Sequence, residues 1–236
     1  MRIGKIYHGE KTKKDKITII ELKEEQIPPI RYTPDIDFDD EKSVHKYVRS
    51  LKTYIRGSME YSKLMRFLKC HMEMNKCFFL KKVWQYKGSK ISMEIHHTGF
   101  TMEDIIDTVL RKRYKEGEDY NASYIAREIM LLHYRGMIGL TSLCATCHEL
   151  IHAEGSQLFI PLQDCGFGDM NLFYEEYKPY MNKALAKKYE TYRLMSETVD
   201  NIENIIPDYL DVNIIYYEQE HIKIPNMKTI LELIAA

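Results

Sequence analysis

The sequence predicts an α+β fold in which a few strands accompany a larger number of helices. Apolar residues recur every three or four positions over several long stretches, which is typical of amphipathic helices. Residues 90–97 and 140–143 instead have the short, β-rich character of strands, and residues 1–26 are expected to form a β-hairpin. A content of 44% hydrophobic and 29% charged residues is ordinary for a globular chain.

Three regions are expected along the 236 residues. Residues 1–40 would hold the hairpin and a linker rich in proline and aspartate. Residues 41–168 would form the central domain, which begins with a basic helical segment, and residues 169–236 would form a helical C-terminal region.

Helix ends are predicted from capping residues and breakers. Asp39 or Asp40 can cap a helical segment over 43–69, which Gly57 and Ser58 would divide in two. Thr101 begins a capping signal for the next helix, and Asn121 or Ser123 can cap the one after it. Further helices are expected near 170–182 and 184–206, and a short one should follow the strand at 140–143.

Charge is distributed unevenly, although the net charge is only −1. Residues 42–90 contain thirteen Lys or Arg and two acids, a local balance of +11. Such a segment predicts a polyanionic partner, and a solvated helix face is the alternative. The cations expected to contact a phosphate backbone are Lys46, Arg49, Lys52, Arg56, Lys63 and Arg66.

Membrane and secreted classes are not expected. The sequence has no apolar run of about 18 residues, and its first residues do not resemble a signal peptide. Five cysteines, an odd number, argue against a disulfide framework. A cytoplasmic location, in the host cytoplasm if the chain is phage-encoded, is therefore expected.

Four histidines in two tight groups predict a shared metal site. His96 and His97 end a predicted strand, and His148 and His152 lie one turn apart on a predicted helix. Three of these imidazoles could bind one ion, leaving the fourth free to act as a base.

The motif Glu94-Ile95-His96-His97, followed by His148-Glu149-Leu150-Ile151-His152, resembles the HNH endonucleases in their histidine-rich, colicin-like form. It is also similar to HNH-type proteins of large bacteriophages. The resemblance covers roughly residues 90–165 and implies a ββα-metal finger, here with a helical insertion between its strands.

The resemblance implies a role for each matched residue. His97 takes the place of the general base, His96, His148 and His152 those of the metal ligands, and Glu94 that of a residue in the polar network. The family's asparagine is replaced by Gly139, which puts activity in doubt, and His133 or Asn121 could substitute for it.

The chemistry implied is metal-dependent hydrolysis of DNA phosphodiester bonds. The ion would stabilise charge on the phosphorane while a neutral imidazole accepts a proton from water. Imidazole ligands suit Zn, Ni, Co or Mn better than Mg. Arg135 is a candidate phosphate clamp, and cleavage of both strands would favour a homodimer.

Other interpretations remain open. A degenerate finger would keep the metal and the basic surface as a structural or DNA-binding protein that cleaves nothing. His148-Glu149-x-x-His152 also matches zinc proteases, with Glu149 as base, but lacks a clear third ligand. Cys144 and Cys147 match a haem-attachment motif, or could join Cys70 and Cys77 in a structural zinc site, with buried free thiols as the simpler alternative.

Overall fold

The computed structural model describes residues 34–80, 83–85, 91–153 and 158–198. The predicted N-terminal hairpin at 1–26 lies outside these residues, as do residues 199–236. The described part contains α1 (Glu41–Arg56), α2 (Met59–His71), β1 (Met93–His97), α3 (Met102–Lys115), α4 (Ala122–Tyr134), β2 (Leu140–Cys144), α5 (Ala145–His152), α6 (Met170–Tyr177) and α7 (Lys183–Glu197). Two short 3-10 helices, Leu162–Asp164 and Lys178–Tyr180, lie on either side of α6.

Helices α1 and α2 form because each presents one apolar stripe and has a side-chain cap. The Asp40 carboxylate caps α1 by accepting from the Lys42 amide, and the Ser58 hydroxyl caps α2 by accepting from the Tyr61 amide. The predicted break at Gly57 and Ser58 is therefore confirmed. The buried stripe of α1 follows the helical period and consists of Val44, Val48, Leu51 and Ile55.

Helices α3 and α4 begin where the sequence predicts. Thr101 and Asp104 form a reciprocal capping box at the start of α3. The side-chain oxygen of Asn121 accepts from the amides of Ser123 and Tyr124, so Asn121, and not Ser123, caps α4.

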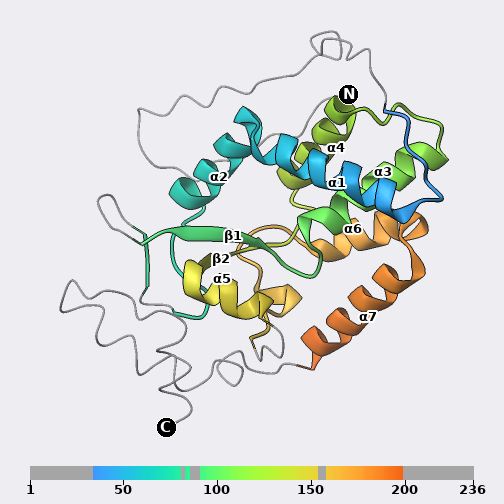
Figure 1. The fold of residues 1–236 in the computed structure, drawn as a ribbon. Coiled ribbons are helices and arrows are strands. Elements are labelled where there is room, and N and C mark those ends of the chain that lie inside the picture. Colours follow the sequence, from blue (N-terminus) through green and yellow to red (C-terminus); the bar gives the residue numbers. More distant parts are fainter. Residues whose placement is uncertain (1–33, 81–82, 86–90, 154–157, 199–236) are drawn as a thin grey trace.

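One antiparallel pair of strands lies at the centre of the described structure. In its register Met93 is opposite Cys144, His96 is opposite Thr141 and His97 is opposite Leu140. Helices α3 and α4 occupy the connection between the strands, and α5 follows β2 directly. Figure 1 shows α5 on one side of the strand pair and helices α1–α4 on the other.

Two apolar clusters hold these elements. The larger one packs residues of α1–α4 with α6 and α7 and includes Phe100 stacked on Tyr189, with ring centroids 4.4 Å apart. The smaller one lies against the strands and α5, and its buried members are Cys77, Phe79, Val83, Met93, Leu143, Cys144, Cys147, Leu158 and Ile160.

The predicted α+β class is confirmed at this level, with seven α-helices and one strand pair in the described ranges. The division at residues 40 and 168 stays a prediction. None of the helices described is both long and apolar enough to cross a membrane.

Candidate metal centre

Three histidine side chains converge from two elements. His96 comes from β1, and His148 and His152 come from successive turns of α5. One ring nitrogen of each lies within 4.8 Å of the others. Two nitrogens bound to one zinc ion are at most about 4 Å apart, because each bond is about 2 Å long. Small side-chain movements would therefore let one ion bind all three.

Glu94 holds the ring of His148. The Glu94 Oε2 atom lies 2.9 Å from His148 Nδ1. This hydrogen bond places a proton on Nδ1 and leaves the lone pair of Nε2 available to an ion. Glu94 precedes His96 by two residues on β1, so both side chains lie on the same side of the strand.

The environment keeps His96 neutral. Burial, together with the nearby His152 and His148, lowers its pKa to about 3. Burial also lowers the pKa of His152. Neutral imidazoles keep the lone pairs that a metal ion requires. The three residues can therefore hold a metal at neutral pH.

His97 points into the interior instead. Its Nε2 lies 3.1 Å from Nε2 of His133, whose Nδ1 lies 2.8 Å from the carbonyl oxygen of Ile129. Because that carbonyl only accepts, His133 donates through Nδ1 and accepts at Nε2 from the Nε2 proton of His97. Burial lowers the pKa of His97 well below its usual value, and that of His133 to about 4. Of the two residues considered as replacements for the family's asparagine, His133 is the one that bonds to His97.

Gly139 occupies a position where a side chain would be tightly packed. A Cβ atom there would lie 3.0 Å from Cys165 Sγ and 3.4 Å from the Met170 Cβ. The Gly139 carbonyl accepts from the Thr98 amide at 2.9 Å, just after β1. An asparagine at this position would require the surrounding chain to move, so the departure from the HNH pattern is built into the packing.

Three cysteines form a second cluster. The sulfurs of Cys77, Cys144 and Cys147 all lie within 4.8 Å of one another, and all three residues are buried. Cys70 is exposed at the end of α2 and is not part of the cluster. The structure thus selects Cys77 as the partner of the Cys144–Cys147 pair.

The cysteine cluster ionises as a unit. Hydrogen bonds from Cys144 and Cys147 lower the pKa of Cys77 to about 3. The pKa of Cys147 is raised by its hydrogen bonds with Cys144 and Cys77 and by burial. One thiolate is therefore stabilised by two thiols. This set of sulfur ligands can hold a soft metal ion.

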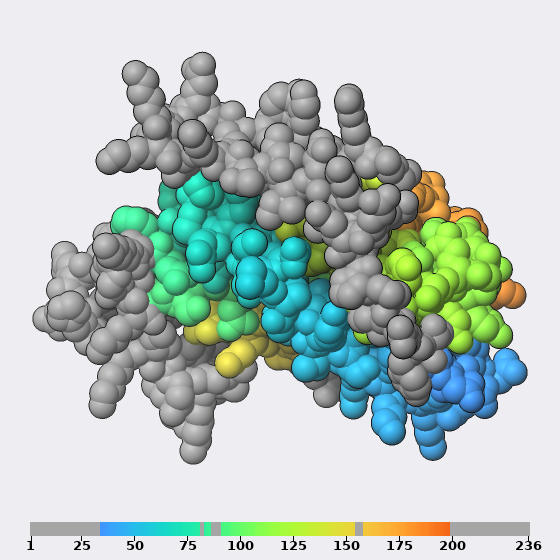
Figure 2. All heavy atoms as spheres, turned by 90° about the horizontal axis from the view of Figure 1, so that it is seen from above, coloured from blue at the N-terminus to red at the C-terminus, as the bar shows by residue number. Residues whose placement is uncertain are grey.

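The remaining predicted site residues lie elsewhere. Arg135 is the exposed C-cap of α4. Five of the six predicted DNA-contacting cations are exposed on α1 and α2, which form a continuous part of the surface in Figure 2. The sixth, Lys52, is half-buried and lies 2.5 Å from Glu103.

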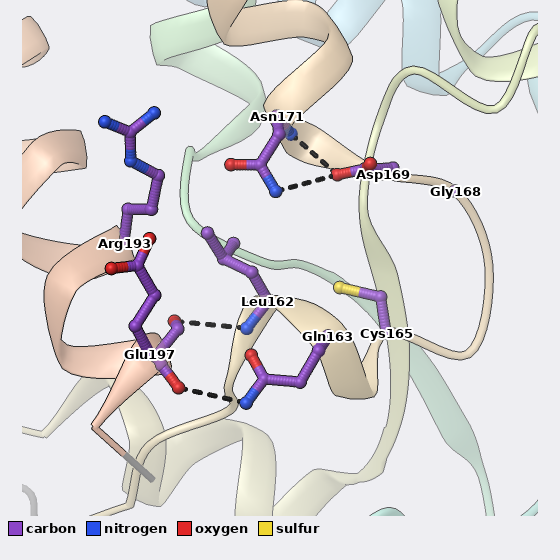
Figure 3. A pocket seen from close by; sticks show the side chains of 9 residues that line it. Leu162, Gln163, Cys165, Gly168, Asp169, Asn171, Arg193 and Glu197 are labelled. Carbon is purple, nitrogen blue, oxygen red and sulfur yellow. Dashed lines mark hydrogen bonds between the residues drawn. The ribbon is translucent and has the colours of Figure 1, made fainter.

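A pocket of about 550 Å³ lies between α7 and the segment before α6 (Figure 3). Much of its polar lining is bonded internally, since Gln163 donates to the Ser196 carbonyl and Asp169 accepts from Asn171. Burial raises the pKa of Cys165, which keeps this thiol protonated. No sequence pattern indicates this pocket, because its polar residues have no distinctive spacing. Its bonds hold the loop to α7 and support no particular ligand.

A family model described as bacteriophage G278-like virion protein matches residues 3–228. The match includes every element that builds the two clusters. No curated protein and no solved structure matches the chain.

This match overturns the predicted endonuclease. The HNH assignment, the nuclease activity with His97 as base, and the cytoplasmic location are wrong, because the matched family is one of virion proteins. The structure agrees with this correction at two residues already described: the position of the family's asparagine is a tightly packed Gly139, and His97 is buried against His133. The protease and haem interpretations are not supported either, and the expected dimer loses the double-strand cleavage on which it was based.

Proposed function

Because the chain belongs to the bacteriophage G278-like virion protein family, we propose that it is a non-catalytic structural component of the phage particle, stabilised by a bound divalent metal ion. In this proposal the strand pair and α5 form a metal-binding ββα unit that has kept its ligands without nuclease activity. The observation that carries it is the convergence of His96, His148 and His152 beside a His97 that is buried.

The ion would act as a cross-link. Its ligands come from β1 and from both turns of α5, so binding would fix the helix against the strands. A helix of eight residues is marginal without such support. Three imidazoles favour Zn, Ni, Co or Mn over Mg. Zinc is also the expected ion for Cys144 and Cys147, because thiolates are soft ligands.

Metal removal tests the stabilising role. Adding Zn²⁺ to the chelated full chain should raise the midpoint of thermal unfolding, since binding to the folded state stabilises it by mass action. The change His152→Ala should reduce this effect, whereas His45→Ala, an exposed histidine of α1, should not. Equal zinc-dependent shifts in wild type and His152→Ala would reject the histidine site.

A nuclease assay tests the non-catalytic part. Supercoiled plasmid incubated with the chain and Mg²⁺, Mn²⁺, Ni²⁺ or Zn²⁺ should stay intact. Metal-dependent cleavage that is lost in His97→Ala would contradict this proposal.

The exposed cations of α1 and α2 favour a second role, contact with DNA. Five of the six lie exposed, and the segment 42–90 carries a balance of +11. Each phosphate contact should contribute about 0.9 to the slope of log affinity against log salt concentration. Reversing charge at Lys46, Arg49, Lys63 and Arg66 should weaken binding to duplex DNA and flatten that slope. Reversal of Lys183 and Lys187 on α7 is the matched control for reversal of Lys46 and Arg49 alone, and equal effects of these two pairs would reject this surface.

A further inference from the structure

The cysteine cluster and the histidine cluster share one short helix. Cys144 is the N-cap of α5, Cys147 lies in its first turn, and His148 follows immediately. Consecutive residues of a helix project about 100° apart. The sulfur of Cys147 therefore faces the smaller apolar cluster, and the ring of His148 faces His96 and Glu94.

Cys77 reaches this helix from a separate segment whose backbone is held independently of any ion. The Cys77 amide donates to the Val83 carbonyl at 2.8 Å, and the Phe78 amide donates to the Ser142 carbonyl of β2 at 2.9 Å. The Ser142 hydroxyl also donates to the carbonyl of Lys76. These bonds fix the segment against β2 and bring the Cys77 sulfur to the start of α5.

The sulfur of Cys77 has a further bond that suits a thiolate. The Leu80 amide donates to Cys77 Sγ at 3.5 Å, three residues along the same turn. An amide donor on a buried sulfur stabilises negative charge there. Simple apolar packing of three thiols does not require such a donor.

We infer that Cys77, Cys144 and Cys147 form a second metal site, for Zn²⁺, and that its occupation positions α5 so that His148 and His152 can bind the ion of the histidine site. The effect on metal binding by His148 and His152 rests on the proposed histidine site. The metal site of the three cysteines does not.

The charges of the buried cluster support binding of a dication. Three thiolates packed within 4.8 Å in an apolar environment would repel one another strongly. A Zn²⁺ ion bound to all three sulfurs would offset most of this charge and leave a net charge of −1 in the apolar cluster.

Coupling between the thiolate site and the histidine site follows from the way in which α5 is anchored. Of its eight residues only Cys147 is buried, so the first turn is its main anchor. Zinc bound there would also join α5 to the segment of Cys77. With that turn fixed, His148 and His152 lose less freedom when they bind an ion, and the histidine site becomes tighter. Coupling is reciprocal, so an ion at the histidines should tighten the thiolate site by the same factor.

Cobalt titration of the reduced, metal-free full chain tests this inference. Only sulfur ligands give intense thiolate-to-cobalt charge-transfer absorption. In wild type we expect two equivalents of Co²⁺ to bind, with the charge-transfer band complete after one. Cys77→Ser should weaken the band and lower Co²⁺ affinity at the histidine site about tenfold. Cys165→Ser, a thiol outside the cluster, should change neither.

The two proposals fail in different ways. Absence of the band in wild type, or an unchanged band and histidine affinity in Cys77→Ser, would overturn the thiolate site. His96→Ala should bind one equivalent of Co²⁺ with the charge-transfer band retained. The affinity of the thiolate site for Co²⁺ should fall by the same factor of about ten. If His96→Ala still binds two equivalents, the histidine site fails while the thiolate site stands.

Wild-type protein gives an independent readout should Cys77→Ser not fold. Zn²⁺ should slow the alkylation of Cys77, Cys144 and Cys147, measured by mass spectrometry, and leave exposed Cys70 unaffected. Equal alkylation rates with and without Zn²⁺ would overturn the inference.

Discussion

Acid should destabilise this protein more than an otherwise identical chain in which residue 133 cannot titrate. His133 is buried and its pKa in the folded chain is about 4, compared with about 6.5 when unfolded. The unfolded chain therefore binds a proton at this residue below pH 6.5, while the folded chain does so only near pH 4. Stability from neutral His133 is complete above pH 6.5 and is lost as the pH falls towards 4.

The magnitude follows from the two pKa values. Between pH 7.5 and pH 4.5, linkage predicts a loss of roughly 2 to 3 kcal/mol from His133 alone. His97, whose pKa is also lowered by burial, acts in the same direction. In His133→Gln the amide can still donate to Ile129 and accept from His97, but it has no proton to gain.

The assay is urea unfolding followed by circular dichroism at both pH values. A chelator is present throughout, so that proton competition with bound metal does not contribute. The acid-induced loss in His133→Gln should be roughly 2 to 3 kcal/mol smaller than in wild type. Carboxylates and the distant histidines titrate in both chains and cancel in this comparison, whereas loss of the His133 charge raises the pKa of His97 and widens the difference. Equal losses would refute the assignment of a buried, neutral His133.

Further changes should affect stability in graded ways. Gly168→Ala places a Cβ 2.1 Å from the Ile138 carbonyl oxygen at a φ of +74°, so urea unfolding should show a loss of at least about 2 kcal/mol. Gly117→Ala, at a φ of +67° with open space around it, should cost only about 1 kcal/mol, and a larger loss than in Gly168→Ala would contradict this reasoning. Glu128→Gln removes the charge that lies 2.5 Å from Arg113, and should cost about 2 kcal/mol by thermal or urea unfolding. An unchanged midpoint for Glu128→Gln would show that this ion pair does not stabilise the fold.

Local signals made much of the fold predictable. Asp40, Thr101 and Asn121 cap the helices that their neighbours in the sequence indicate, because a capping bond spans only two or three residues. The break at Gly57 and Ser58 is equally local. The contact between His97 and His133 spans 36 residues and depends on how α4 packs, which no local pattern reveals.

The choice between Cys70 and Cys77 illustrates the same limit. Both precede the Cys144–Cys147 pair, but Cys70 belongs to α2 and is exposed, while the turn after α2 brings Cys77 inwards. Only the bonds of that turn to β2 decide between them.

Function was harder to predict than the ligand positions. Histidine spacing locates groups that can bind a metal, yet it does not show whether the surrounding residues still permit chemistry. Gly139 was the residue that indicated a degenerate finger and not an active one, because an active site of the HNH kind needs an amide side chain at that position. The physical basis of that signal is the absence of space beside Cys165.

The pairing of β1 with β2 determines which histidine reaches α5. His96 is opposite Thr141 and faces α5, while His97 is opposite Leu140 and faces His133. A shift of one residue would exchange the two imidazoles, sending a metal-binding ring into the apolar interior. No tight turn fixes the alignment, because residues 98–139 separate the strands. The Thr98 amide, which donates to the Gly139 carbonyl at 2.9 Å, extends the pairing of β1 with β2 by one step. Pairing of the two strands is therefore required before the three histidines can share one ion.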